Sequence, residues 1–158
     1  MQPKTKPGSV SRAVVEAFYR ALANRDMDAI AAYLDERVVW TISGPVDILP
    51  YCGERVGKSS VMKLLMHDSP GFLSDRRFVP SMTLVDGDGA AVLGRLTAYK
   101  CDDGHAISYR IAHFIKFRDE KVVEYMSIID SFDAVEQMLG YNLDAHDGYR
   151  VEGDVVAV

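Results

Sequence analysis

Two ionisable side chains stand out, because the pattern around them places His113 and Asp130 on an otherwise apolar sheet face. Residues 106–117 and 121–131 show the β-rich, period-two composition of strands, and the polar residues 118–120 between them suit a tight hairpin. Imidazole and carboxylate groups in an apolar pocket are the usual carriers of general acid and base catalysis. The two residues therefore predict a pocket in which protons could be transferred.

The register of this hairpin decides which side chains share the pocket face. With residues 119–120 as a two-residue turn, His113 lies opposite Met126. In the same register Tyr109 lies opposite Asp130. A shift of one residue would turn over every side chain of one strand. The predicted pocket face carries Tyr109, Ile111, His113, Ile115, Phe117, Val122, Glu124, Met126, Ile128 and Asp130.

Both candidate catalytic residues have a second interpretation. A lone histidine on an apolar strand face, such as His113, is often a core residue that does no chemistry. Asp130 ends its strand just before a predicted helix, so it could cap that helix instead of acting on a ligand. In the predicted register the two side chains are too far apart for a direct hydrogen bond. They would act on opposite ends of one ligand or be unrelated.

A further set of residues is predicted to bind the ligand. Trp40, the only tryptophan, lies beside a long loop and would either line the pocket or pack in the core. The direction of Arg95 depends on the turn at residues 102–104. A two-residue turn points it away from His113, and a three-residue turn with a glycine bulge points it inward. The ligand-binding candidates are Trp40, Tyr33, Arg95, Tyr109, Met126 and Ile111, whereas Tyr51, on the loop, is expected in solvent.

The elements that position these residues follow from apolar spacing and turn residues. The expected helices span residues 12–23, 27–34, 58–67 and 132–139, and the expected strands span residues 38–43, 77–85, 90–101, 106–117 and 121–131. Residues 44–57 are expected to form a long irregular loop. The order predicts an α+β fold in which a curved, mainly antiparallel sheet wraps around three N-terminal helices and leaves a cone-shaped interior.

Length and composition narrow the possible classes. A chain of 158 residues with 48% apolar residues suits one domain, expected at residues 11–140 between a disordered arm (1–10) and a C-terminal tail (141–158). A net charge of −5 argues against nucleic acid as a partner. No apolar run approaches the roughly 18 residues of a membrane span, so a cytoplasmic location is expected. Neither cysteine nor histidine spacing suggests a metal site, and no cofactor is expected.

Several segments resemble the nuclear transport factor 2-like superfamily, and within it the SnoaL-like and ketosteroid isomerase-related branch. The similarity lies in residues 24–30 before Tyr33-Leu34-Asp35, in residues 49–61, and in residues 122–130 before the closing helix. It covers roughly residues 11–140. The resemblance implies an α+β cone with an interior pocket, and commonly a homodimer formed through the outer face of the sheet.

The resemblance also implies residue roles, and several are not matched here. The ketosteroid isomerases use a tyrosine, a protonated aspartic acid and an aspartate base, at positions similar to Phe18, His113 and Thr41. An ordinary steroid isomerase is therefore not expected. Limonene epoxide hydrolases hold a water with an arginine and two aspartates. Asp130 and Arg95 resemble two of these, but Thr97 replaces the third.

Two functions remain after these comparisons. The first is a cofactor-free enzyme that uses His113, and Asp130 if it acts with it, in an isomerase, cyclase or dehydratase type of step on a hydrophobic, oxygenated small molecule. The second is a non-catalytic domain of the same fold that binds a ligand or a protein. Phe114, Tyr125 and Ile129 on the reverse sheet face predict a homodimer.

Overall fold

A six-stranded sheet organises the computed structural model, which describes residues 8–143. Most of the predicted arm (residues 1–7) and most of the predicted tail (residues 144–158) lie outside the described residues. The helices are α1 (Arg12–Asn24), α2 (Met27–Tyr33), α3 (Lys58–Lys63), α4 (Ser69–Phe72) and α5 (Ser131–Leu139), with a π-helical turn, η1 (Leu64–Asp68), between α3 and α4. The strands are β1 (Leu34–Ser43), β2 (Gly53–Val56), β3 (Leu73–Asp86), β4 (Gly89–Lys100), β5 (Ala106–Arg118) and β6 (Lys121–Ile129).

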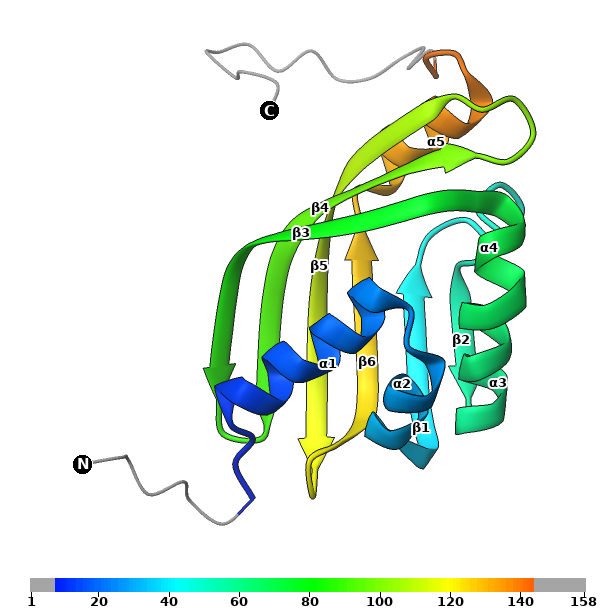
Figure 1. Cartoon of the computed structure of the whole chain (residues 1–158). Coiled ribbons are helices and arrows are strands. Elements are labelled where there is room, and N and C mark those ends of the chain that lie inside the picture. Colours follow the sequence, from blue (N-terminus) through cyan, green and yellow to red (C-terminus); the bar gives the residue numbers. More distant parts are fainter. Residues whose placement is uncertain (1–7, 144–158) are drawn as a thin grey trace, which may run out of the picture.

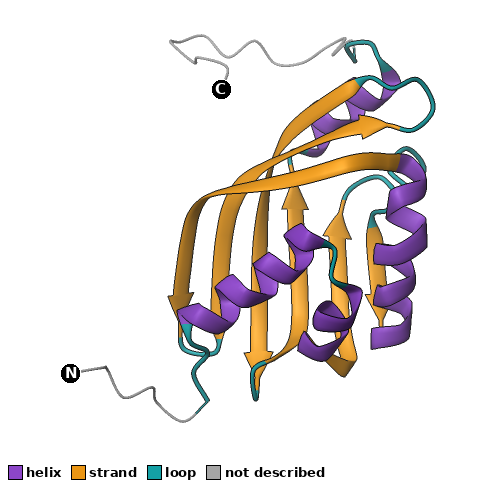
Figure 2. Ribbon diagram, in the orientation of Figure 1, coloured by secondary structure: helices purple, strands orange, loops and turns teal. Residues whose placement is uncertain are grey.

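The sheet is mixed, open and mainly antiparallel. Its strand order is β2-β1-β6-β5-β4-β3, and only the β1–β6 pair is parallel. Helix α1 lies across one face, and β3 curves over that face from the end of α4 to the far edge of the sheet (Figure 1). Helices and strands therefore form two layers, as Figure 2 shows. The predicted α+β class with a curved sheet around N-terminal helices is confirmed.

Helices α1 and α2 on this face each begin at a side-chain cap. The Ser11 hydroxyl accepts a hydrogen bond from the Val14 amide at 3.2 Å, and the Asp26 carboxylate accepts one from the Ala29 amide at 3.0 Å. Helix α1 then buries Val15, Phe18 and Ala21 against the sheet. None of the described helices has the length and apolar content needed to cross a bilayer.

Several boundaries differ from the sequence prediction. Strand β1 starts at Leu34 instead of residue 38. The expected loop at residues 44–57 contains β2, which is only four residues long and pairs with β1, too short a strand for period-two alternation to be recognised. The third helix continues through η1 to Phe72 instead of ending near residue 67, and β3 starts at Leu73 instead of residue 77. A bulge in β3 after Ser74 interrupts the alternation there and hides the start of the strand.

Candidate functional site

A cavity of about 890 Å³ lies between the inner face of the sheet and the helices. This volume is within the range of about 300–1,000 Å³ that is usual for small-molecule sites. Most of its lining is apolar, and a few polar side chains project into it. The residues used below are Tyr19, Arg20 and Arg25 from α1 and its C-cap, Trp40 from β1, Tyr51 from the following loop, Ser69 from α4, and Arg76, Arg77, Phe78, Tyr109, Ile111, His113, Tyr125 and Ser127 from the sheet.

His113 is the imidazole that the sequence predicts in this cavity. Strand β5 alternates between buried and exposed residues, and this alternation leaves the His113 side chain inside with 6% exposure. Its Nδ1 lies 2.7 Å from the hydroxyl oxygen of Tyr19 on α1. The rings of Phe78 and Tyr125 pack against the imidazole, with centroid distances of 4.6 and 5.1 Å. The imidazole is thus enclosed by aromatic rings and has one polar partner.

Burial sets the protonation of this pair. Removal from water lowers the pKa of His113 to about 3, because none of the described carboxylates is close enough to stabilise the imidazolium. Burial also raises the pKa of Tyr19 well above its usual value. Both groups are therefore neutral at physiological pH. The tyrosine hydroxyl can donate to Nδ1, or the protonated Nδ1 can donate to the tyrosine oxygen.

The hairpin that carries His113 differs from the predicted register beyond its turn. Arg118 pairs with Lys121, so the turn has two residues as expected, and Phe117 pairs with Val122. A bulge then leaves Val123 as an extra residue, because the next pair is Lys116 with Glu124. From there on, the predicted faces of β6 are exchanged.

This exchange corrects two sets of predictions. His113 lies opposite Ser127, not Met126, and Met126 is 37% exposed on the outer face, away from the cavity. Tyr125 and Ile129, which were expected on the outer face, are buried on the inner face. Of the three residues predicted for the dimer surface, only Phe114 lies on the outer face of the sheet. Met126 and Ile128 are exposed on that face, and Tyr125 and Ile129 are not.

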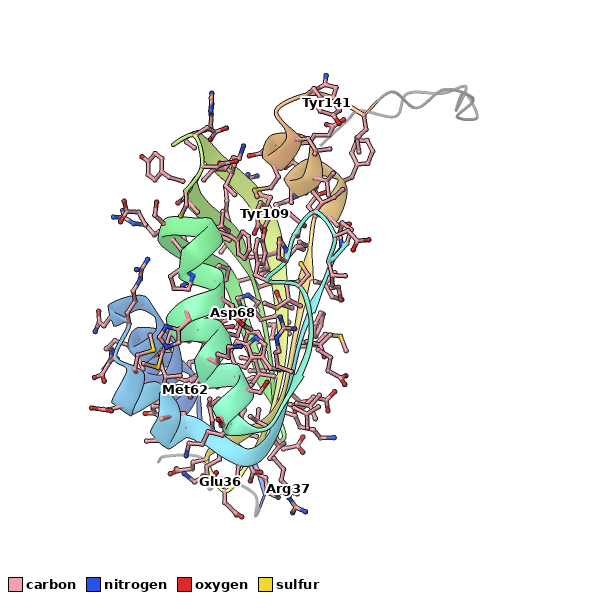
Figure 3. All side chains as sticks on the ribbon, turned by 90° about the vertical axis from the view of Figure 1, so that its right-hand side faces the viewer. Glu36, Arg37, Met62, Asp68, Tyr109 and Tyr141 are labelled. Carbon is pink, nitrogen blue, oxygen red and sulfur yellow. The ribbon has the colours of Figure 1, made fainter. Side chains whose placement is uncertain are left out.

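A pair of tyrosine hydroxyls forms a second polar group in the cavity. The hydroxyl oxygens of Tyr51 and Tyr109 lie 3.1 Å apart, and both side chains are buried. Burial raises the pKa of Tyr51 to about 12, and it raises the pKa of Tyr109 further. Figure 3 shows Tyr109 within the molecule, between the sheet and the helical layer. Tyr51 was expected in solvent, but its loop folds back over the sheet and buries the ring.

Arg76 brings a guanidinium into the same cavity. The bulge in β3 places Asp75 in the left-handed region, with φ of 46°, and turns the next side chain inward. Nη1 of Arg76 donates a hydrogen bond to the Ser69 hydroxyl, and this serine is itself buried. No residue pattern indicates this placement, because Arg76 and Arg77 are neighbours of the same type and only the bulge distinguishes them.

Three buried polar atoms have no hydrogen-bond partner among the described residues. They are Nε1 of Trp40, Nε of Arg76 and the hydroxyl oxygen of Ser127. All three residues line the cavity. Buried polar groups are nearly always satisfied in folded proteins, and an unpaired one costs about 1–3 kcal/mol. Their gathering around one cavity indicates that a polar ligand or water completes them.

Comparison with known proteins identifies the family. Residues 15–125 match the model of the SnoaL-like domain. The chain belongs to the SnoaL-like domain family. This confirms the family that the sequence motifs suggested. A search of curated proteins found no match to this SnoaL-like chain.

Solved structures show the same nuclear transport factor 2-like fold. A protein from Rhodopseudomonas palustris, described as a candidate isomerase, is 29% identical with a TM-score of 0.70, over 80% of this SnoaL-like chain and 93% of its own. TerC, co-crystallised with polyporic acid, is 22% identical with a TM-score of 0.69, over 80% and 96% of the two chains. An LEH-like epoxide hydrolase from M. tuberculosis is 18% identical with a TM-score of 0.65, over 81% and 88%.

The structure of this SnoaL-like domain brings four of the predicted site residues together. Trp40, Tyr109, Ile111 and His113 all line the cavity. The indole of Trp40 stacks on Tyr125 with a centroid distance of 3.6 Å. The sequence left open whether Trp40 lines the pocket or packs in the core, and it does both.

The other predicted residues lie outside the cavity. Tyr33 packs edge-on against Phe18 at 5.9 Å. Arg95 pairs with Arg110 across the strands and donates to the Ser108 hydroxyl at 3.3 Å, so the outward alternative holds.

Asp130 is also outside the cavity. It begins α5, where its carboxylate accepts from the Asp133 amide at 3.5 Å, and it lies 3.6 Å from Nη2 of Arg110. Asp130 therefore caps α5, which is one of the two roles that the sequence suggests. The bulge in β6 exchanges the faces of that strand, so the Asp130 side chain does not point into the cavity. Residues 8–143 contain no group of three or more His, Cys, Asp or Glu side chains arranged to hold a metal ion.

Proposed function

We propose that this SnoaL-like domain is a cofactor-free enzyme that transfers a proton on a hydrophobic, oxygenated small molecule in its cavity. The observation that carries the proposal is the hydrogen bond between Tyr19 and the buried His113, in which a neutral imidazole faces an apolar cavity of ligand size. A neutral imidazole can accept a proton at one nitrogen while the other is oriented by a hydrogen bond.

The proposed reaction moves one proton between two carbon atoms of the same ligand and needs no other reactant. His113 takes a proton from a carbon next to a carbonyl group, which leaves an imidazolium and an enolate; the imidazolium then returns the proton to another carbon of the same ligand. No described carboxylate stabilises the imidazolium, so the enolate must supply the compensating charge. The hydroxyls of Tyr51 and Tyr109 are hydrogen-bond donors for a developing oxyanion. A base with so low a pKa suits substrates whose carbon-bound protons are already acidified.

The second candidate is a binding domain that performs no reaction. The same low pKa favours it, because a histidine with a pKa of about 3 is a weak base in the free protein. Ligand binding alone would satisfy the polar atoms around the cavity equally well. The two candidates differ in one respect, which is whether protons of a bound ligand exchange with solvent.

Proton exchange gives a test that does not need the natural substrate. The protein is mixed with cyclic ketones and lactones in deuterated water, beginning with 2-tetralone, and the loss of proton signals next to the carbonyl is followed by NMR. We expect the protein to accelerate exchange and His113→Gln to abolish the acceleration. His67→Gln, which removes an exposed imidazole from η1, is the matched control.

The indole N–H signal of Trp40 reports ligand binding in the same samples, because this is the only tryptophan and it lines the cavity. Binding without exchange by any member of the panel would favour the binding domain over the enzyme. Acceleration that persists in folded His113→Gln would remove this residue from the mechanism.

We also propose that two copies associate through the outer face of the sheet. Several exposed apolar side chains lie there on neighbouring strands, and Figure 3 shows no described helix covering the side chains that project from this side. They are Leu84, Leu93, Phe114 and Ile128, with Met126 beside them. Such a patch is more extensive than single exposed apolar residues and is typical of an interface.

Light scattering at micromolar concentration tests this association. We expect the mass of a dimer for the unmodified chain and of a monomer for Ile128→Glu. Phe132→Glu is the control, since Phe132 is also an exposed apolar residue but lies on α5. A monomeric unmodified chain would refute the association without affecting the proposal for the cavity.

A further inference from the structure

The charged side chains that line the cavity are mainly positive, although the whole chain has a negative net charge. The protein carries a net charge of −5, yet the charged side chains of the cavity lining are four arginines and two carboxylates. None of the four arginines lies within 4.0 Å of a carboxylate among the described residues. The arginines are Arg20, Arg25, Arg76 and Arg77. The cavity is therefore an electropositive site in an acidic protein.

Arg76 is the least exposed of the four arginines, because it is partly buried and the other three are exposed. Burial lowers its pKa, and the neighbouring positive charge of Arg25 lowers it further. An arginine remains charged even so, which means that a cation is held in a largely apolar cavity beside a second cation. A buried charge without a counter-charge is strongly unfavourable unless something else compensates it.

The compensation within the protein is incomplete. The Ser69 hydroxyl accepts one hydrogen bond from Nη1 of Arg76, and the Nε–H of the same guanidinium is buried without a partner. Burial holds the nearby hydroxyls of Tyr51 and Tyr109 in their protonated forms, so they offer hydrogens rather than negative charge. Unused donors of a guanidinium, together with tyrosine hydroxyls, form a set of groups that an anionic oxygen can bind.

We propose that the ligand of this cavity is a hydrophobic organic anion whose charged oxygen group, a carboxylate or an ionised enol, is bound by Arg76 with the Tyr51–Tyr109 hydroxyl pair beside it. The rest of the ligand then extends along the apolar lining toward His113 and Tyr19. This inference names the substrate class of the site in the proposed function and rests on that proposal for the use of the cavity.

Three probes of similar size test the inference by calorimetry on the full chain. They are 2-naphthoate, which carries a carboxylate, the neutral ketone 2-acetylnaphthalene, and 2-hydroxy-1,4-naphthoquinone, which is an ionised enol at neutral pH. The Trp40 indole N–H signal verifies that each probe enters the cavity. We expect 2-naphthoate to bind about 10- to 100-fold more tightly than 2-acetylnaphthalene, the range that charge-assisted hydrogen bonds give.

Variants assign this preference to Arg76. In Arg76→Gln the preference for 2-naphthoate should disappear while binding of the ketone changes by less than about twofold, and Arg76→Lys should retain part of it because the charge remains without the planar fork. Arg37→Gln is the control for loss of one positive charge; Arg37 is exposed and lies at the end of the molecule away from Tyr109 (Figure 3). The comparison of probes on the unmodified chain needs no variant to fold.

Each outcome decides the inference. A naphthoquinone that binds with the same dependence on Arg76 supports the ionised enol as the natural group, and one that does not supports the carboxylate. Equal binding of 2-naphthoate and 2-acetylnaphthalene, or a preference that survives in Arg76→Gln, would overturn the anion site and leave the proposed proton transfer standing. If neither of these two probes moved the Trp40 signal, the inference would fail together with the cavity that it rests on.

Discussion

The hydroxyl oxygen of Tyr19 lies 2.7 Å from Nδ1 of His113, and this contact joins helix α1 to strand β5 across 94 positions of sequence. It is the only hydrogen bond of the imidazole ring among the described residues. The position of the ring and the choice of its tautomer therefore depend on one phenol.

Removing that phenol should destabilise the protein and change the tautomer of the histidine. For Tyr19→Phe we expect the free energy of unfolding to fall by about 1 kcal/mol, the usual net contribution of a partly buried hydrogen bond. Urea unfolding measures this, and the 15N shifts of the His113 ring report the tautomer. Tyr33→Phe is the control, because the Tyr33 ring packs on Phe18 and its hydroxyl has no hydrogen bond within the described part of the chain. Unchanged ring shifts in Tyr19→Phe would contradict the contact.

The low pKa of His113 makes stability depend on pH. Unfolding returns the pKa from about 3 to about 6.5, so between these values the unfolded chain binds a proton that the folded chain does not. Stability from this group is therefore complete above about pH 6.5 and is lost as the pH falls toward 3, by up to about 1.4 kcal/mol per pH unit.

His113→Gln should remove this dependence. We expect the stability difference between the unmodified chain and His113→Gln to shrink by about 2 kcal/mol when urea unfolding at pH 7.5 is repeated at pH 5. His67→Gln, which lacks an exposed imidazole instead, should show no such change. A difference that stays constant with pH would mean that the imidazole is hydrated or paired in solution.

Gly94 permits the aromatic packing over His113. A Cβ atom at this position would lie 2.5 Å from both Cε2 of Phe78 and the carbonyl oxygen of Val79, closer than atoms can approach. We expect Gly94→Ala to lower the free energy of unfolding by about 2 kcal/mol through overpacking, and to weaken binding of probes in the cavity as Phe78 moves. Gly71→Ala, with open space around the added carbon, is the control for the same substitution. Equal stability of the two variants would show that β3 shifts freely.

Asp130 should matter for stability and not for the ligand. Asp130→Ala removes the N-cap of α5 and a half-exposed ion pair with Arg110. We expect a loss of about 1 kcal/mol, mainly from the cap, since exposed ion pairs contribute little. Calorimetry with 2-naphthoate should give the same affinity as the unmodified chain. A large loss of affinity in a folded Asp130→Ala variant would show that Asp130 takes part in ligand binding.

The sequence predicted most of the architecture, because apolar spacing and turn residues act locally. Helices 12–23 and 27–34, the four long strands and the two-residue turn at residues 119–120 all follow from such patterns. The inward direction of His113 follows from alternation in β5, which is unbroken between its ends.

The site was less predictable, because it depends on two bulges and on contacts between distant segments. Val122 and Val123 are both apolar, so the pattern of apolar and polar residues does not reveal which of them is the extra residue in β6. Tyr19 follows Phe18 in a helix whose pattern says nothing about which sheet residue it meets. Arg76 lies just before the predicted start of its strand. Long-range packing decides all three, and residue types alone do not record it.

The bulge at Val123 determines whether the odd-numbered or the even-numbered residues of β6 face the inside of the protein. Beyond it, odd-numbered residues such as Tyr125 and Ser127 face the cavity and even-numbered ones such as Met126 and Ile128 face outward. If Val123 paired with Lys116 instead of bulging out, every later residue of the strand would shift by one place and its two faces would be exchanged. Substitutions that remove this bulge without shortening the strand are therefore the mutations by which relatives of this chain could acquire a new cavity wall and a new outer surface together, while every other strand keeps its place.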